Sequence, residues 1–295
     1  VLAGLIAREE PSAICCTYPV YAFLLDALAR EGRLTVPFFN IVTDSISINS
    51  LWWRAGAAGW FLPNEDSAAV MRRAGVDDRR LHVLGFPVPE FFHEHAGRLQ
   101  PPDLAAGAAP RVLYIVNSGT RGAADTARRL LTTTNWAVTC TVGREEKLRR
   151  DLVRLSAGRR PPAEILGWTN EIPRLLMTHH VVISKAGGAT TQEALAARCP
   201  MIVNQIVPGQ EEGNYELLRR RGVGALAETP EAVVTELQRA FHAGGRVWRE
   251  WRAALQPLSR PMAAREIASA VMARAPGRPE FEPVPIPFRA VVAPA

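Results

Sequence analysis

Short apolar runs alternate with amphipathic stretches from one end of this chain to the other, and this alternation constrains the fold more than any other feature. The first part of the sequence contains four nearly continuous apolar runs, SAICCTY, VPFFNIVTD, GWFLP and LHVLG. Stretches of helical periodicity, such as YAFLLDALAREG and EDSAAVMRRAG, separate them. Strands that are hydrophobic on both faces are typical of parallel sheets that helices cover on both sides. The pattern therefore predicts an α/β fold of doubly wound, Rossmann-like domains.

The alternation is interrupted once, at residues 96–110, where AGRLQPPDLAAGAAP is rich in Ala, Gly and Pro and lacks periodicity. We interpret this stretch as a linker. The alternation resumes with RVLYIVN and continues through WAVTCTVG, AEILGWT, HVVIS and PMIVNQ to a run of C-terminal helices. We therefore predict one domain over residues 1–100, a second over 101–274 and a Pro-rich tail over 275–295. Ligands of such folds bind in the cleft beyond the carboxyl ends of the strands.

The composition narrows the class of protein. The net charge of +6 is carried mainly by Arg, and the Arg residues are interleaved with Glu and Asp. This arrangement is typical of solvated helix faces rather than of a nucleic-acid-binding stripe, although a weak attraction to an anionic membrane surface stays open. No run approaches the roughly 18 apolar residues of a membrane-spanning helix. The four cysteines show neither zinc-site spacing nor the density of a disulfide scaffold, which indicates a reduced, cytoplasmic setting.

One turn between a strand and a helix lies in the stretch ISKAGGATTQEALAAR, residues 183–198. Gly187 and Gly188 precede the helix, whose first N–H groups and positive dipole end attract an anion such as a diphosphate. The stretch matches neither the Walker lysine loop nor the dinucleotide pattern G-x-G-x-x-G. Glu193 follows in the helix, where a carboxylate accepts hydrogen bonds from both hydroxyls of a ribose. A capping box formed with Thr190 is the alternative role for Glu193.

A second polar loop follows the next strand. In IVPGQEEGNYELL, a Pro-Gly turn precedes four hydrogen-bonding side chains within five positions, those of Gln210, Glu211, Glu212 and Asn214. This density suits a sugar ring, whose hydroxyls need paired donors and acceptors. An acidic first turn favoured by the helix dipole is the structural alternative. Because both loops follow neighbouring strands of one sheet, we expect them to open on the same cleft, which favours a binding role.

The motifs GWT, SKAGG, QEAL and PGQEEGN occur in this order within residues 136–214. As an ordered set they resemble the donor domain of the monogalactosyldiacylglycerol synthase and diacylglycerol glucosyltransferase family, relatives of the peptidoglycan N-acetylglucosaminyltransferase. PFFNIVTD, a Trp-containing loop and LHVLGFPVPEFF resemble the acceptor-side domain of the same family. The resemblance covers most of the chain apart from the linker and the tail.

The resemblance implies a GT-B fold, in which two Rossmann-like domains face a cleft. It also implies transfer of a hexose, with inversion, from a UDP-sugar to a lipid hydroxyl such as that of diacylglycerol. No metal or cofactor is expected, because N–H groups at a helix N-terminus hold the diphosphate of the donor. Carried over by position, the residues beside the base are Gly167, Trp168 and Thr169; those beside the diphosphate are Lys185, Gly187, Gly188 and Thr190; the ribose ligand is Glu193; and those on the sugar are Gln210, Glu211 and Asn214. Packing of Trp168 in the core is an equally weighted alternative to a contact with the base.

The acceptor side departs from the family pattern. Where the family often has Thr-Asp, a short gap and His before a Trp, this chain has Asn49 between Asp44 and Trp52. Asn is not a general base at neutral pH, so Asp44, at the carboxyl end of a strand, is the candidate that takes the acceptor proton. Trp52 and Trp53 either contact the membrane interface or an acyl chain, or pack beneath their loop. The family's glycine-rich loop with a His has no counterpart after Val1, so we expect the N-terminal domain to be incomplete.

The sequence thus predicts a UDP-sugar-dependent hexosyltransferase of bacterial type, cytoplasmic and peripheral on the inner face of the cell membrane. Its expected partners are a UDP-sugar, a lipid acceptor and an anionic membrane surface, and not nucleic acid. A UDP-sugar 2-epimerase is one alternative, although the corresponding turn of that family usually reads Ser-Asp-Ser-Gly-Gly and this chain has Ser-Lys-Ala-Gly-Gly. The other alternative is a non-catalytic sugar-nucleotide-binding protein, which Asn49 and the absent N-terminal loop favour.

Overall fold

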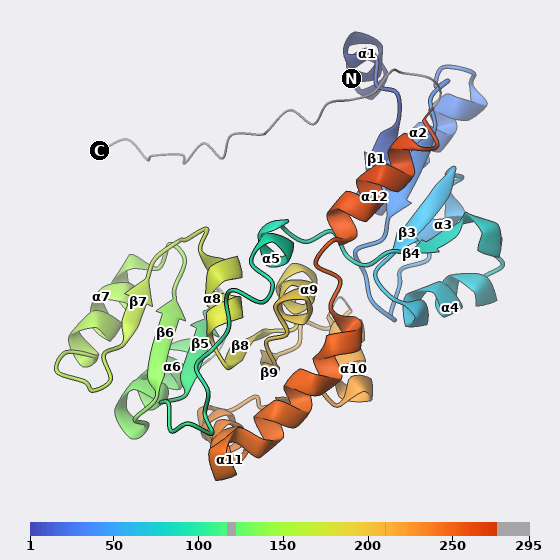
Figure 1. Cartoon of the computed structure of the whole chain (residues 1–295). Helices are drawn as coiled ribbons and strands as arrows, with labels where there is room; N and C mark the ends of the chain where they lie inside the picture. Colours follow the sequence, from blue (N-terminus) through green and yellow to red (C-terminus); the bar gives the residue numbers. More distant parts are fainter. Residues whose placement is uncertain (117–121, 210, 276–295) are drawn as a thin grey trace.

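The computed structural model describes residues 1–116, 122–209 and 211–275, which form two lobes, each built around a parallel sheet (Figure 1). The first sheet has the strand order β1-β2-β3-β4, and all its strand pairs are parallel. Its strands are β1 Ile14–Cys16, β2 Phe38–Ile41, β3 Gly59–Leu62 and β4 Leu81–Val83. The helices of this lobe are α1 Leu2–Glu9, α2 Pro19–Arg30, α3 Leu51–Arg54 and α4 Glu65–Arg73, and the short 3-10 helix η1 Asp78–Arg80 precedes β4.

The second sheet has the strand order β10-β9-β8-β5-β6-β7, and all its pairs are parallel. Its strands are β5 Arg111–Ile115, β6 Ala137–Thr141, β7 Glu164–Leu166, β8 Val181–Lys185, β9 Met201–Gln205 and β10 Gly224–Leu226. The helices between them are α6 Ala123–Thr133, α7 Glu146–Leu155, α8 Ile172–Thr178, α9 Gly188–Ala197 and α10 Glu212–Arg221. From β5 the chain adds β6 and β7 on one side, and it then returns to add β8, β9 and β10 on the other side. Doubly wound sheets bind ligands at such a switch point, which here lies between β5 and β8.

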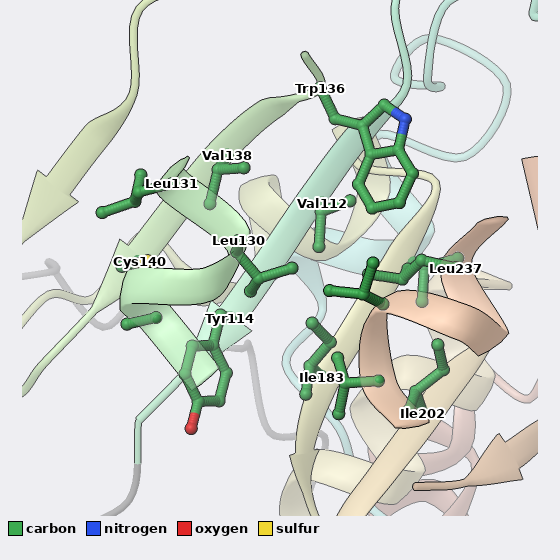
Figure 2. Close-up of a cluster of buried hydrophobic side chains, with 14 of the residues drawn as sticks. Val112, Tyr114, Leu130, Leu131, Trp136, Val138, Cys140, Ile183, Ile202 and Leu237 are labelled. Atoms are coloured by element: carbon green, nitrogen blue, oxygen red, sulfur yellow. The ribbon is translucent and has the colours of Figure 1, made fainter. Parts of the chain in front are cut away.

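Successive residues of the second sheet pack on opposite faces. Val112 and Tyr114 belong to a buried cluster with α6 and with α11 Pro230–Leu255, which contributes Leu237 (Figure 2). Leu113, between them in the strand, belongs to a second cluster with α8, α9 and α10. This period of two is the geometry of a strand, and burial of both faces explains why the strands read as unbroken apolar runs.

The two faces of the first sheet are covered by parts of the chain that are far apart in the sequence. The helices α2, α3 and α4, which connect β1 to β4, lie on one face, where Phe38 and Trp60 pack. Phe39 and Phe61 pack on the opposite face against Ile267 of α12 Ala263–Met272. The last described helix thus crosses back to the first lobe (Figure 1). The predicted range 101–274 grouped this helix with the second domain, whereas its packing places it on the first.

The linker and the C-terminal helices meet at a kink. Within α11, residues 242–245 are non-helical, so this segment consists of two helices, as the stretches PEAVVTELQRAFHAGG and RVWREWRAAL suggest. Gly245 has a φ of 82°, and a Cβ there would lie 3.3 Å from the Cβ of Leu104, which is a buried linker residue. The glycine therefore allows the linker to pack against the kink. The short elements α5 Phe91–Glu94 and η2 Gln256–Leu258 lie before the linker and after α11.

The predicted α/β class and the order of the strands and helices before and after the linker are confirmed. β10 is the strand that the apolar pattern did not predict, because GAL is too short to form an apolar run. It pairs with β9, and Gly224, with a φ of 109°, lies so close to Met201 that a Cβ would overlap the Met201 carbonyl oxygen. Trp248 and Trp251 of α11 are buried in the core, as their spacing on one helical face predicts.

Candidate active site

The Lys185–Gly188 turn connects the carboxyl end of β8, beside the switch point, to the start of α9. Gly187 is the N-cap of α9, and no side chain caps this helix end. The first intrahelical hydrogen bond runs from Thr191 N–H to the Gly187 carbonyl at 2.9 Å. The N–H groups before it, those of Gly188, Ala189 and Thr190, have no acceptor within the helix. This helix end therefore presents N–H donors and a positive dipole end to an anion.

Glu211 holds Lys185 beside this helix end. The Glu211 residue is 4% exposed, and one of its carboxylate oxygens forms an ion pair with Lys185 Nζ. The other oxygen accepts the Val207 N–H at 3.0 Å. A lysine side chain is flexible, so this pair reduces the conformational freedom that Lys185 would lose on binding a ligand. Glu211 thus orients Lys185 and also fixes the loop that follows β9.

Asn214 joins the two loops through its side-chain amide. It is 4% exposed, and its Nδ2 donates to the Ala186 carbonyl at 2.9 Å. Its Oδ1 is also buried but accepts no hydrogen bond from the described residues. A buried polar atom without a partner costs about 1–3 kcal/mol. A hydroxyl group of a bound ligand would satisfy this oxygen.

Asp44 follows β2 on the opposite lobe and is held by a buried tryptophan. Trp52 is 1% exposed, and its indole Nε1 donates to Asp44 Oδ2 at 2.7 Å. The Trp52 carbonyl accepts two hydrogen bonds, from Asn40 Nδ2 at 3.2 Å and from Trp60 Nε1 at 2.6 Å. The indole is therefore fixed by packing and by the hydrogen bonds to its own backbone. The other carboxylate oxygen of Asp44 has no hydrogen-bond donor among the described residues.

These groups meet in one cleft of about 790 Å³ between the two lobes. The second lobe contributes Lys185, Gly187, Gly188, Glu211 and Asn214, and the first lobe contributes Asp44 and Trp52. The remaining first-lobe side of the cleft is largely apolar and includes Tyr18, Pro19, Val20, Ile48 and Leu51. The volume is that of a ligand site. One wall offers groups for an anion and hydroxyls, and the other offers a carboxylate within an apolar surface.

Comparison with known proteins finds a family that this chain resembles. The family described as monogalactosyldiacylglycerol (MGDG) synthase matches residues 1–88. A processive diacylglycerol beta-glucosyltransferase of Bacillus mycoides (strain KBAB4) is 22% identical over 293 residues, which cover 98% of this chain and 74% of that protein. The chain thus resembles the MGDG synthase family and the diacylglycerol glucosyltransferases. The resemblance that the ordered motifs indicated is confirmed.

Solved structures show the fold that this family resemblance implies. The UDP-GlcNAc 2-epimerase from Neisseria meningitidis bound to UDP-GlcNAc has a TM-score of 0.66 at 12% identity, covering 92% of this chain and 79% of that one. MurG of Acinetobacter baumannii has a TM-score of 0.65 at 13% identity, covering 92% and 76%. The predicted GT-B fold is confirmed. At these identities the likeness concerns the fold alone, since epimerases and transferases share it.

The residues that the MGDG synthase resemblance places beside the base do not line the cleft pocket. Gly167, Trp168 and Thr169 follow β7, at the edge of the sheet, and the Thr169 hydroxyl oxygen accepts the Glu171 N–H at 3.1 Å. Trp168 is 72% exposed, so its packing in the core, the alternative from sequence, is wrong. An exposed indole at the carboxyl end of a strand is free to stack on a ligand, and contact with the base stays a prediction.

Glu193 does not close a capping box. The helix begins at Gly188, so Thr190 lies inside its first turn and is not the N-cap. The Glu193 carboxylate is half-buried and makes no hydrogen bond or ion pair with the described residues, and burial raises its pKa. A role as ribose ligand stays a prediction for Glu193, as does the diphosphate role of Thr190; neither lines the cleft pocket. Gln210, predicted to contact the sugar, lies outside the described residues.

The acceptor-side tryptophans have a packing role. Trp52 is buried, so insertion of its ring into a membrane interface is excluded. Trp53 is partly buried against the core of the first lobe, together with Trp52. The packing alternative from sequence is confirmed for both, because the short helix α3 turns these side chains toward the sheet. Trp52 still lines the cleft at its edge.

Three residues that sequence reasoning did not single out connect the lobes beside this site. Gln192 Nε2 donates to the hydroxyl oxygen of Ser45 at 3.0 Å, and Gly213 lies against the backbone of Ser45. No local pattern indicates a contact between residues so far apart in the chain. The glycine within the acidic stretch EEGN was a signal, since a glycine in a helix often marks close packing.

Neither a metal cluster nor a membrane span is present in the part of the chain that the structure describes. No group of three or more His, Cys, Asp or Glu side chains there is placed to hold a metal ion. No helix there is both long enough and apolar enough to cross a bilayer.

Proposed function

We propose that this protein transfers a hexose from a UDP-sugar to a hydroxyl group of a lipid acceptor such as diacylglycerol, with inversion at the anomeric carbon. The observation that carries the proposal is the cleft itself. A helix N-terminus with its lysine and an unsatisfied buried amide oxygen stand on one wall, and a carboxylate within an apolar surface stands on the other. The relatives in the MGDG synthase family support a lipid as acceptor.

The second lobe would bind the donor through N–H groups and one positive side chain. Free N–H groups at the start of α9 stabilise a diphosphate and the charge that develops as it leaves. Lys185, kept in place by Glu211, adds a positive charge at the same point. Asn214 Oδ1 would accept a hydrogen bond from a sugar hydroxyl. This set needs no metal ion to neutralise the diphosphate, and we propose that none is used.

The first lobe would activate the acceptor. Asp44 takes the proton of the acceptor hydroxyl while that oxygen attacks the anomeric carbon from the side opposite the diphosphate. The new carbon–oxygen bond forms as the bond to the diphosphate breaks, and UDP leaves toward the N-terminus of α9. The apolar side of the cleft, with Tyr18 and Val20 exposed near Asp44, suits the acyl part of a lipid.

The lipid substrate sets the cellular location that we propose. A protein that takes UDP-sugars from the cytoplasm and a hydroxyl from a lipid works on the inner face of the cell membrane. The net charge of +6 favours a peripheral contact with anionic lipid. The charge is distributed among many Arg residues, so we expect this contact to be weak and salt-sensitive.

A transfer assay tests the proposal. The purified protein is incubated with labelled UDP-glucose, UDP-galactose or UDP-N-acetylglucosamine and vesicles that contain diacylglycerol, and the lipid is extracted and counted. We expect label in the lipid with at least one donor, and none with Asp44→Asn. Epimerised free sugar nucleotide without labelled lipid would establish the epimerase alternative. Binding of UDP without either product would establish the non-catalytic alternative.

The assignment of Glu193 to the ribose has its own test. Replacing Glu193 by Ala removes a half-buried carboxylate that makes no contact with the described residues, so little folding stability is at stake. Losing a charge-assisted hydrogen bond to a ribose hydroxyl should weaken UDP binding about tenfold. Titration calorimetry with UDP measures this effect, and Glu266→Ala on the exposed face of α12 is the matched control. Equal affinities for the two variants would place the ribose elsewhere.

A further inference from the structure

The loop Ser45–Ser47 of the first lobe docks between two helices of the second lobe. Ser45 is 2% exposed, and its hydroxyl oxygen accepts the hydrogen bond from Gln192 of α9 at 3.0 Å. Ile46 packs its side chain against the buried cluster formed with α8, α9 and α10. Because Asp44 directly precedes this loop, the position of the carboxylate depends on how the loop is docked.

Gly213 brings the backbones of the two lobes close together beside the site. A Cβ at this position would overlap the carbonyl oxygen of Ser45 and would lie 2.7 Å from the backbone nitrogen of Ser47. Gly213 lies in the first turn of α10 and is not among the residues with positive φ, so its backbone does not require glycine. Glycine costs about 1 kcal/mol in a helix relative to alanine. The approach of the loop is therefore the physical reason for glycine here.

The docked loop is in a strained conformation. Ile46 has a φ of 59°, which is unfavourable for a β-branched residue and costs on the order of 1–3 kcal/mol. The Ile46 N–H donates to the Ser67 hydroxyl oxygen at 3.3 Å, and the same hydroxyl donates to the Asp44 carbonyl at 3.5 Å. Two sets of contacts thus offset the cost of the strain: the hydrogen bonds through Ser67 within the first lobe, and the packing of the Ile46 side chain against the second lobe. Part of this compensation is available only when the two lobes are in contact.

We infer that Gly213 is a positioning residue: by accepting the backbone of the Ser45–Ser47 loop, it closes the cleft and sets Asp44 opposite the start of α9. The inference rests on the proposed function for the role of Asp44. The inference separates donor binding from sugar transfer. The donor-binding groups on α9 and α10 belong to one lobe, whereas Asp44 lies opposite them only when the loop is docked. Donor binding is thus independent of Gly213, and transfer depends on it.

Gly213→Ala tests the inference, with Gly4→Ala as the matched control. Gly4 also lies in a helix, α1, and a Cβ there meets no atom within 4 Å. We expect Gly213→Ala to lower kcat for transfer at least tenfold and to change the KM for the UDP-sugar less than threefold. Amide hydrogen exchange in residues 43–50 should become at least tenfold faster, because the undocked loop loses its protected packing. Gly4→Ala should match the wild type in both measurements.

A second variant and a stability measurement make the result decisive. Gln192→Ala removes the hydrogen bond to Ser45 without adding a methyl group, and we expect a smaller acceleration of exchange in the same residues. The thermal midpoint of Gly213→Ala should be within a few degrees of that of the wild type. Unchanged exchange and kcat in a folded Gly213→Ala protein would overturn the inference. If the wild type transfers no sugar, the proposed function fails, and the exchange comparison alone decides whether Gly213 docks the loop.

Discussion

Trp52 shows how one residue serves both the core and the candidate site. Its ring fills the first lobe, its carbonyl accepts hydrogen bonds from Asn40 and Trp60, and its indole N–H donates to Asp44. The sequence placed this tryptophan near the acceptor, and the structure replaces a membrane contact with a hydrogen bond to the candidate base. An oriented carboxylate loses less entropy in the transition state than a free one.

Trp52→Phe should therefore reduce the rate of transfer by more than its effect on folding stability would explain. The phenyl ring retains most of the packing but cannot donate to Asp44, so we expect kcat to fall at least tenfold and the KM for the UDP-sugar to change less than threefold. The matched control is Trp60→Phe, which loses an indole N–H bonded to the Trp52 carbonyl and has no contact with Asp44. An equal loss of kcat in both variants would show that the effect is general damage to the core.

Among the secondary-structure elements, the C-terminal end of α6 is closed by an arginine from a loop after α7. The Arg159 guanidinium donates to the carbonyl oxygens of Leu131, Thr134 and Trp136 at 2.9, 2.7 and 2.7 Å, and to that of Pro161 at 3.0 Å. Burial lowers the pKa of Arg159. The planar group thus satisfies the carbonyls that a helix leaves without N–H partners, and it joins α6 to the start of β6.

Arg159→Lys should destabilise the second lobe. An ammonium group cannot reach four carbonyls in different directions, so we expect a loss of about 2 kcal/mol and a thermal midpoint lower by roughly 4–8 °C. Differential scanning calorimetry measures the midpoint. Arg160→Lys, an exposed neighbour without a hydrogen bond to the described residues, is the control. A midpoint within 1–2 °C of the control's would mean that solvent replaces these hydrogen bonds at little cost.

For the whole molecule, His180 connects the linker, the second sheet and the C-terminal helices. Its Nδ1 accepts the Arg111 N–H at 2.8 Å, its Nε2 donates to the Pro102 carbonyl at 2.8 Å, and its carbonyl accepts from Trp248 Nε1 at 2.7 Å. These partners fix a neutral imidazole at the point where the linker reaches the second lobe. Burial lowers the pKa of His180 to about 4.

This lowered pKa predicts acid sensitivity. As pH falls below the ordinary histidine value of 6.5, the unfolded chain binds a proton that the folded chain refuses until about 4. Stability is therefore lost as pH falls through this window, by about 2–3 kcal/mol at pH 4.5. The drop in thermal midpoint between pH 7 and pH 4.5 should be about 5 °C smaller in His180→Gln than in the wild type. His242→Gln, at an exposed histidine, should leave the drop unchanged, and an unchanged drop in His180→Gln would contradict the prediction.

The sequence alone determined the parts of this protein that depend on neighbours in the chain. Apolar runs of strand length between amphipathic stretches specify parallel sheets, since backbone geometry sets a period of two in strands and of 3.6 in helices. SKAGG and PGQEEGN follow strands, and carboxyl ends of parallel strands share an edge. Lys185, Glu211 and Asn214 were therefore predicted to meet, and they line one cleft. Glu193 and Trp168 were assigned by resemblance, and their ligand contacts remain predictions.

Only the tertiary structure decided which distant surfaces cover one another. An apolar pattern shows that a face is buried but not which element buries it, so it could not show that α12 packs on Phe39 and Phe61. Likewise, no periodicity relates Trp52 to Asp44, or Gly213 to Ser45, because these contacts arise when a loop meets a helix from another part of the chain. The groups that would bind the donor belong to one lobe and are close in sequence. The carboxylate opposite them is held by Trp52 of the first lobe, and the loop that follows it packs against the second lobe. No local sequence pattern encodes these contacts.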